Sequence, residues 1–214
     1  MSYSQLQQDT RWQRRKDKRP AEIIGAALEL FVERGYATTR LEDIAKAAGV
    51  SKASLYRYFD NKEALFKAMV KQVVIPQIEK AETTVKDYKG EISPLINGMV
   101  VNWWETVGET RICGIPKLII SEAANFPELA EFYVNEVIKR GRKLVMKMIQ
   151  RGMQSGEFRQ DIVPEYAARL IISPLVFAAI WKQSLASYDD QYDVKAYLSF
   201  ETDVILRGIK KSIN

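Results

Sequence analysis

Residues 41–59 constrain the fold of this chain more than any other stretch, because they predict two short helices joined by a tight turn. Apolar residues at helical spacing predict the first helix over residues 41–48, and Gly49 suits the turn that follows. Ser51 is the predicted N-cap of the second helix, which extends to about Tyr58. Small and hydroxylated side chains dominate the outer face of that helix. The pair therefore has the form of a helix-turn-helix whose second helix is thin enough to enter a DNA major groove.

The flanking residues complete a small helical domain around this pair. A preceding amphipathic helix is predicted over residues 21–34, with Pro20 at its first position and Gly35 just past its end. The sequence TRLE at residues 39–42 has the form of a capping box for the helix that follows it. Asp60 is expected to cap the next helix in the same way.

Positive charge is concentrated in the first third of the chain. Residues 1–62 carry 12 basic and 8 acidic side chains, whereas residues 63–214 carry 20 and 19. This distribution fits a polyanion-binding head on a near-neutral body, and charge alone fits a solvated basic N-terminus as well. Residues 1–19 are polar and end in RWQRRKDKR. They are expected to form a basic, flexible arm, which either contacts DNA or acts as a solubilising tail.

Composition argues against several other classes of protein. The chain has one cysteine, Cys113, and no histidine, which excludes an intrachain disulfide, a cysteine-based zinc site and a Ser-His-Asp triad. We therefore expect no enzyme, no metal site and no cofactor. No apolar run approaches the roughly 18 residues of a membrane span, and the polar N-terminus is unlike a signal peptide. A cytoplasmic location without membrane association is expected.

Residues 20–65 resemble the DNA-binding domain of the TetR/AcrR family of transcriptional regulators. The matching segments are ELFVERGYATT, LEDIAKAAGVSKASLYRYF and DNKEALF. The resemblance implies that this domain binds double-stranded DNA. It further implies that the contacts come from a set of small, hydroxylated, aromatic and basic side chains: Thr39, Arg40, Ser51, Lys52, Ala53, Ser54, Tyr56, Arg57, Tyr58 and Lys62.

Within this set, similar proteins use the residues at Thr39 and Lys62 to bind backbone phosphates, and the residue at Lys52 to contact bases or phosphates. Two positions depart from the family pattern. Arg40 stands where relatives often have a small residue, and it is long enough to read guanine or to take a further phosphate. Ala53 replaces a frequent glycine. Arg57 is open to three roles, namely a solvated charge, a phosphate contact or a base contact.

Beyond residue 65 the pattern predicts only helices. They are expected over residues 64–89 with a kink at Pro76, and over residues 94–107, 116–124, 127–154, 164–184 and 192–211. The predicted fold is thus all-α with about nine helices. An N-terminal three-helix DNA-binding domain over residues 20–65 precedes a helical effector-binding and dimerisation domain over residues 66–214.

The body contains many large, adaptable side chains, which suit either a core or a pocket for a bulky apolar ligand. The resemblance implies an effector pocket among the middle helices and a homodimer formed by the last two. Pocket candidates are Met99, Trp103, Trp104, Phe126, Phe132, Tyr133, Met148 and Trp181. Dimer candidates are Pro174, Leu175, Ala178, Trp181, Phe200 and Val204.

Together these expectations describe a ligand-responsive, dimeric repressor that binds a palindromic operator and is released by a small hydrophobic or aromatic effector. The alternatives are a DNA-binding regulator without a small-molecule effector, and an activator.

Overall fold

The computed structural model describes the backbone of residues 3–211 and the side chains of residues 19–211. The chain divides into two compact units, of which unit 1 ends at Gln72 and unit 2 begins at Val73. Within the described residues every named element is a helix, and the only β feature is an isolated bridge between Phe158 and Lys210. The prediction of an all-α fold is confirmed.

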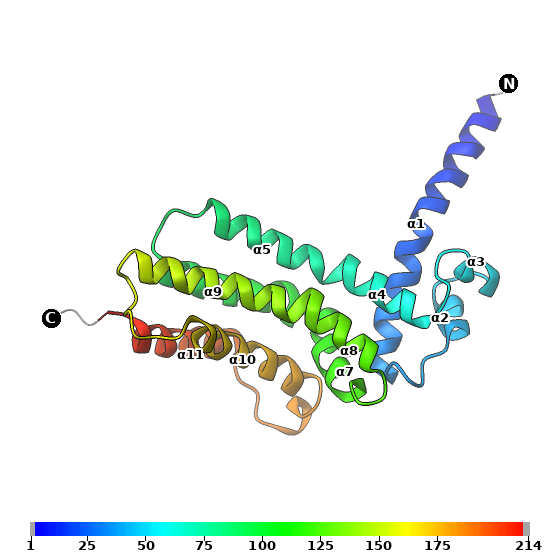
Figure 1. Cartoon of the computed structure of the whole chain (residues 1–214). Coiled ribbons are helices and arrows are strands. Elements are labelled where there is room, and N and C mark those ends of the chain that lie inside the picture. The colour runs from blue at the N-terminus through cyan, green and yellow to red at the C-terminus, as the bar shows by residue number, and fades with distance from the viewer. Residues whose placement is uncertain (1–2, 212–214) are drawn as a thin grey trace. The chain divides into compact units, whose positions relative to one another are not determined.

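Unit 1 contains three helices and nearly all of a fourth (Figure 1). They are α1 (Tyr3–Arg34), α2 (Leu41–Ala47), α3 (Lys52–Tyr56) and α4 (Lys62–Val73). Gly35 and Gly49 have φ angles of 87° and 65°, which glycine adopts without a steric penalty. The predicted turns after the first two helices are therefore present at the expected residues.

The start of α1 differs from the prediction. The first helix was expected to begin at Pro20, but α1 begins at Tyr3 and contains Pro20 in its interior. Before Pro20 the segment has no other proline and no glycine, and its many Gln, Arg and Lys residues are good helix formers. Pro20 removes one backbone donor without ending the helix. The predicted DNA contact of the basic arm depends on side chains that lie outside the described residues.

The core of unit 1 is aromatic and aliphatic. The rings of Phe31, Tyr36 and Phe66 form a cluster with centroid distances of 5.3, 6.0 and 5.8 Å. Ile44 of α2 and Leu55 of α3 are completely buried. Helices as short as α2 and α3 are unstable alone. Each is stabilised by burying one large apolar residue against the longer helices.

Two of the predicted helix caps are wrong. The N-cap of α2 is Arg40, and its side chain makes no capping hydrogen bond within the described part of the chain. Thr39 is not a cap, because its hydroxyl points inward and donates to carbonyl oxygens. The cap of α4 comes from Asn61 and not from Asp60, since the Ala64 amide donates to Asn61 Oδ1 at 2.8 Å.

Unit 2 is a helical bundle built around one core (Figure 1). Its α-helices are α5 (Ile75–Asp87), α6 (Ile92–Trp103), α7 (Ile115–Glu122), α8 (Pro127–Tyr133), α9 (Lys139–Gln154), α10 (Pro164–Lys182) and α11 (Val194–Ile209). The core joins residues of α5, α6, α9, α10 and α11. Two π-helical turns, Trp104–Gly108 and Val134–Ile138, continue α6 and connect α8 to α9. Counting α4 with α5 and α8 with α9 as single helices gives nine in the described residues, as predicted.

The helix predicted over residues 64–89 is divided in two near Pro76, where the sequence predicts a kink. The helix is interrupted at Val74, and Pro76 lies in the first turn of α5. Pro76 has no amide proton to donate to the preceding turn, so the helical hydrogen-bond ladder is broken at this point.

Two arginine side chains of α9 hold α5 and the start of its connection to α6. The Arg140 guanidinium donates to both carboxylate oxygens of Glu82, at 2.8 and 2.6 Å. Arg151 donates to the carbonyl oxygens of Val85 and Tyr88 at 2.6 and 2.7 Å, and so caps the C-terminal end of α5. The partners in each pair are about 60 residues apart in the sequence, so these hydrogen bonds are tertiary contacts that hold α5 against α9.

The Glu157 carboxylate caps the start of α6. It accepts hydrogen bonds from the amides of Ile92 and Ser93 at 2.6 and 2.8 Å, and from the Ser93 hydroxyl. Burial opposes ionisation of this carboxyl, but the hydrogen bonds outweigh burial and hold the pKa of Glu157 below its ordinary value.

None of the described helices is both long and apolar enough to span a membrane.

Candidate functional site

α3 presents a polar face on a firmly anchored backbone. The Ser51 hydroxyl accepts a hydrogen bond from the Ser54 amide at 3.1 Å, which confirms Ser51 as the N-cap. Leu55 and Phe59 are buried beneath the helix, so its other sides stay at the surface. The exposed residues, all predicted DNA contacts, are Ser51, Lys52, Ala53, Tyr56 and Arg57. We call them the α3 surface.

Three other predicted contacts differ in accessibility. Arg40 is exposed at the N-cap of α2, adjacent in sequence to the start of that helix. Tyr58 is half-buried. The Ser54 hydroxyl oxygen is buried and has no hydrogen-bond partner among the described residues, so it does not belong to the α3 surface.

Thr39 and Lys62, the two predicted phosphate contacts, are hydrogen-bonded within unit 1 in this structure. The Thr39 side chain is only 1% exposed, and its hydroxyl donates to the carbonyl oxygens of Leu30 and Gly35 at 3.2 and 2.7 Å. The hydroxyl predicted to contact a phosphate is thus buried and bonded within the domain. Sequence similarity gave no sign of this, because these carbonyls come from the C-terminal end of α1.

Lys62 holds the turn between α1 and α2. Its ammonium group donates to the carbonyl oxygens of Tyr36, Ala37 and Thr39 at 2.7, 3.1 and 3.1 Å. It also lies 4.4 Å from the centroid of the Tyr36 ring. An ammonium group has three protons, and three carbonyls take them here. The backbone at the N-cap of α2 is therefore positioned by the first residue of α4.

Glu42 belongs to the same surface as α3, and sequence reasoning missed it. Its Oε1 lies 2.6 Å from the Lys52 ammonium nitrogen, and both side chains are more than half exposed. The hydrogen bond from Lys52 is the main cause that lowers the pKa of Glu42. The two residues are on different helices, so only the packing of α2 against α3 reveals the pair.

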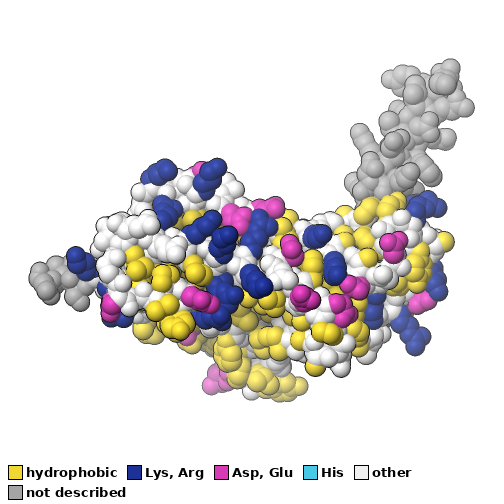
Figure 2. Space-filling model, in the orientation of Figure 1, with side chains coloured by type: hydrophobic (Ala, Val, Ile, Leu, Met, Phe, Trp, Pro, Cys, Tyr) yellow, Lys and Arg dark blue, Asp and Glu magenta, His cyan; other side chains and the backbone are white. Residues whose placement is uncertain are grey.

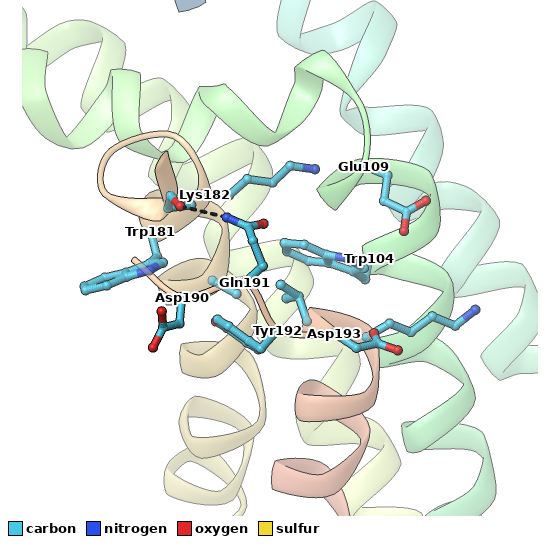
Figure 3. Close-up of a pocket in the computed structure, with 12 residues that line it drawn as sticks. Trp104, Glu109, Trp181, Lys182, Asp190, Gln191, Tyr192 and Asp193 are labelled. Atoms are coloured by element: carbon cyan, nitrogen blue, oxygen red, sulfur yellow. Dashed lines mark hydrogen bonds between the residues drawn. The ribbon is translucent and has the colours of Figure 1, made fainter. Parts of the chain in front are cut away.

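A cleft of about 480 Å³ lies in unit 2, between the end of α6, the end of α10 and the segment that leads into α11. Of the eight predicted pocket residues, Trp104 and Trp181 line it. Figure 3 shows the Gln191 side chain between the two indoles, with its amide donating to the Ala186 carbonyl oxygen at 3.2 Å. Tyr192 adds a third aromatic ring to the lining.

The other six pocket candidates do not line this cleft. Met148 is 1% exposed and belongs to the unit 2 core, and Met99 and Trp103 pack against that core. Tyr133 is buried, and burial raises the pKa of its hydroxyl. Phe126 and Phe132 are half-buried. Sequence reasoning missed the segment over residues 186–193, because it is polar and carries no helical pattern.

Basic side chains of the cleft wall are already paired. The Lys182 ammonium group donates to the Gly108 carbonyl oxygen at 2.8 Å and lies 5.3 Å from the centroid of the Trp104 ring. Lys195 forms an ion pair with Glu105, which raises the pKa of Lys195. Burial raises the pKa of the nearby Cys113 thiol, so this cysteine is not a reactive thiolate.

Both of the last two helices carry exposed apolar side chains, and Figure 2 shows hydrophobic side chains gathered on the side of unit 2 where α10 lies. On α10 they lie at helical spacing, with Tyr166, Leu170 and Phe177 exposed to 65%, 57% and 60%. On α11 the predicted residues Phe200 and Val204 are exposed to 65% and 53%. We call these five residues the α10–α11 surface.

Two of the predicted dimer residues do not lie at the surface of unit 2. Leu175 and Ala178 are buried in the core of unit 2. Pro174 and Trp181 are half-buried. α10 is apolar on most sides, so its sequence alone does not tell which face the chain itself covers. Leu170, which precedes these residues in the sequence, and Phe177, which lies between them, are exposed.

No group of three or more His, Cys, Asp or Glu side chains in the described part of the chain is arranged to hold a metal ion.

Two family models match the chain. Residues 23–69 match the model described as bacterial regulatory proteins, tetR family. Residues 99–192 match the model described as tetracyclin repressor-like, C-terminal domain. The first match contains the α3 surface, and the second contains most of the cleft lining.

Two relatives are similar over nearly the whole chain. The fatty acid metabolism regulator protein of Bacillus subtilis (strain 168) is 26% identical over 197 residues, which are 91% of this chain and 98% of the relative. The HTH-type transcriptional repressor KstR2 of Rhodococcus jostii (strain RHA1) is 28% identical over 189 residues, which are 88% and 91%.

A crystal structure shows the same fold. It is that of the transcriptional regulator FadR from Bacillus subtilis in complex with stearoyl-CoA, with a TM-score of 0.70 at 23% identity. The superposition covers 88% of this chain and 98% of FadR.

Proposed function

Because the chain belongs to the TetR family of bacterial regulatory proteins, we propose that it is a dimeric repressor that releases a palindromic operator when a small apolar or aromatic effector binds unit 2. Family membership makes the chain a DNA-binding transcriptional regulator and not an enzyme. The dimer, the operator and the effector are the proposed parts.

The α3 surface is the observation that carries the DNA-binding role. A capped helix anchored by Leu55 and Phe59 turns two basic side chains, a tyrosine and two small residues outward. Basic and hydroxyl groups bind phosphates, and small residues let the backbone approach the bases. Arg40 extends this surface at the start of α2.

The α10–α11 surface supports a dimer. Large apolar side chains more than half exposed on two neighbouring helices are typical of protein–protein interfaces. An isologous interface of about 1,600 Å² in total would bury them against the same residues of a second copy. Two α3 helices related by that axis would read half-sites one turn of DNA apart, or a multiple of it.

The cleft supports an effector. Its volume of about 480 Å³ lies in the range of small-molecule pockets, roughly 300–1,000 Å³, and three aromatic rings line it. The structural neighbour FadR holds stearoyl-CoA. An apolar or aromatic effector suits these rings, and the polar residues of the segment 190–193 would fix its orientation.

The test of the DNA-binding role is selection of bound duplexes from a random pool. We expect a palindrome with half-site centres about 10 base pairs apart, or a multiple of that spacing. A consensus without two-fold symmetry would contradict the dimeric reader, and the absence of any enriched sequence would contradict the function itself.

The dimer is tested by Phe177→Glu, which places a charge in the α10–α11 surface. Sedimentation should show a monomer that loses affinity for the full operator. Ile120→Glu is the matched control, since Ile120 is 61% exposed on α7 and outside this surface. A dimer that survives Phe177→Glu, or one that Ile120→Glu disrupts equally, would contradict the assignment.

The effector site is tested by filling the cleft. Ala186→Trp adds bulk to its lining, whereas the neighbouring Ser187→Trp adds the same bulk outside it. Small aromatic compounds and stearoyl-CoA are first screened for release of a labelled operator, with coenzyme A as the control. Ala186→Trp should then raise the concentration needed for release by about tenfold or more, which is ~1.4 kcal/mol, without changing DNA affinity. Equal sensitivity of both variants would place the effector elsewhere.

A further inference from the structure

Glu42 and Lys52 form an ion pair on the surface that we propose binds DNA. Their closest atoms, Oε1 and Nζ, are 2.6 Å apart, and the side chains are 52% and 58% exposed. Lys52 belongs to the α3 surface, and its ammonium group lies 5.9 Å from the centroid of the exposed Tyr56 ring. A carboxylate here would face the phosphates of any DNA that α3 contacts, which is electrostatically unfavourable. The pair therefore needs a functional explanation.

We propose that Glu42 restrains Lys52, so that this lysine serves base edges and not backbone phosphates, and that this restraint lowers the affinity of the protein for non-specific DNA. The inference rests on the proposed role of α3 as the DNA-reading helix.

The physical basis is the difference between the two kinds of DNA contact. Non-specific binding comes from lysines and arginines that neutralise phosphates and release counterions. A lysine whose charge is already neutralised by a carboxylate contributes little to that release. Glu42 therefore removes one cation per protomer from the non-specific interaction.

Base contacts are affected less, because an ammonium group has three protons. One proton can stay on Glu42 while the others reach the O6 and N7 acceptors of guanine, which carry no net charge. The positive charge of Arg40 also favours the ionised form of Glu42, so the carboxylate stays charged beside Lys52. Glu42 thereby favours the operator over other DNA.

The test compares four proteins on a random-sequence duplex and on the selected operator, by fluorescence anisotropy between 50 and 200 mM salt. They are the wild type, Glu42→Gln, Lys52→Met and the double variant. Asp43→Asn is the matched control, because it removes one negative charge from the next residue of α2.

On random DNA, Glu42→Gln should steepen the salt dependence by about one phosphate contact per protomer, so the loss of affinity over this range becomes about 3- to 4-fold larger for each protomer bound and about 12-fold larger for a dimer. The double variant, which carries neither charge, should have the salt dependence of the wild type, and Lys52→Met, which leaves the Glu42 carboxylate unpaired, should bind random DNA no more tightly than the wild type. On the operator, Lys52→Met should reduce the preference for the correct base pair over a wrong one, at the single position that Lys52 contacts, by about 5- to 150-fold.

Several results would overturn the inference. They are an unchanged slope in Glu42→Gln, an equal gain in Asp43→Asn, or a gain that persists in the double variant. A change of base preference in Glu42→Gln without tighter random binding would make Glu42 a base reader instead. These results differ from a failure of the proposed function, in which the wild type itself would bind no DNA.

Discussion

Lys62→Met tests the internal role of Lys62 against its predicted role as a phosphate contact. The substitution keeps an apolar stem of similar length and removes the ammonium group. In the structure that group donates to the carbonyl oxygens of Tyr36, Ala37 and Thr39 and lies over the Tyr36 ring. Its loss should therefore loosen the turn that precedes α2, which is remote in sequence from residue 62.

The size of the effect follows from the accessibility of each bond. The bonds to Tyr36 and Thr39 are partly buried, so we assign about 1 kcal/mol to each, below the usual range of ~1.5–3 for a charged donor. The bond to Ala37 is exposed, and water can replace it. The contact with the Tyr36 ring adds ~0.5–1 kcal/mol. The free energy of unfolding of unit 1 should fall by about 2–3 kcal/mol, which corresponds to about 30- to 150-fold faster opening.

Hydrogen exchange measured by mass spectrometry is the suitable assay. Peptides that cover residues 36–48 should exchange faster in Lys62→Met, while peptides of unit 2 serve as an internal reference. Lys46→Met is the control, since Lys46 is an exposed lysine on α2. Unchanged protection, combined with a salt dependence of DNA binding that is shallower by about 0.9, would refute this reasoning, because Lys62 would then act on phosphate.

Two further predictions concern unit 2. A Cβ atom at Gly152 would lie 2.2 Å from a ring carbon of buried Phe158, so Gly152→Ala should cost about 1–3 kcal/mol in a denaturant titration. In the same helix, a Cβ atom at Gly141 would meet no neighbour within 4 Å, so Gly141→Ala should raise the free energy of unfolding by up to about 1 kcal/mol. A Gly152→Ala protein more stable than the Gly141→Ala protein would contradict the packing. The pKa of Glu157 is lowered from 4.5, so its contribution to stability is present above that pH and is lost as the pH falls through the folded pKa. Glu157→Gln should therefore lower the melting temperature at pH 7 and differ less from the wild type below pH 4.5, whereas a constant difference would argue against an ionised cap.

Local signals predicted much of unit 1 correctly. Gly35 and Gly49 end helices because the turns need a left-handed backbone, and Ser51 caps α3 because its hydroxyl lies within reach of a first-turn amide. These features depend only on neighbours in sequence. The long helix before Pro20 was missed because proline was taken as a start signal, although it can also be accommodated within a helix.

The contacts that sequence reasoning missed at the candidate sites share one physical cause. Lys62 meets carbonyl oxygens 23 to 26 residues earlier in the chain, and Glu42 meets Lys52 across two helices. Such contacts depend on how helices pack, which periodicity does not encode. The same holds for Leu175, which the chain buries, and Phe177, which it leaves exposed.

The fastening of α5 to α9 has a mechanical consequence. Arg140 grips α5 near its middle and Arg151 grips its C-terminal end, so the helix is clamped at two points and behaves as a stiff rod. A displacement of α9 must then carry α5 along as one piece, without bending it. Between residues 62 and 87 the chain therefore bends most easily at Val74, where the helical hydrogen bonds are interrupted.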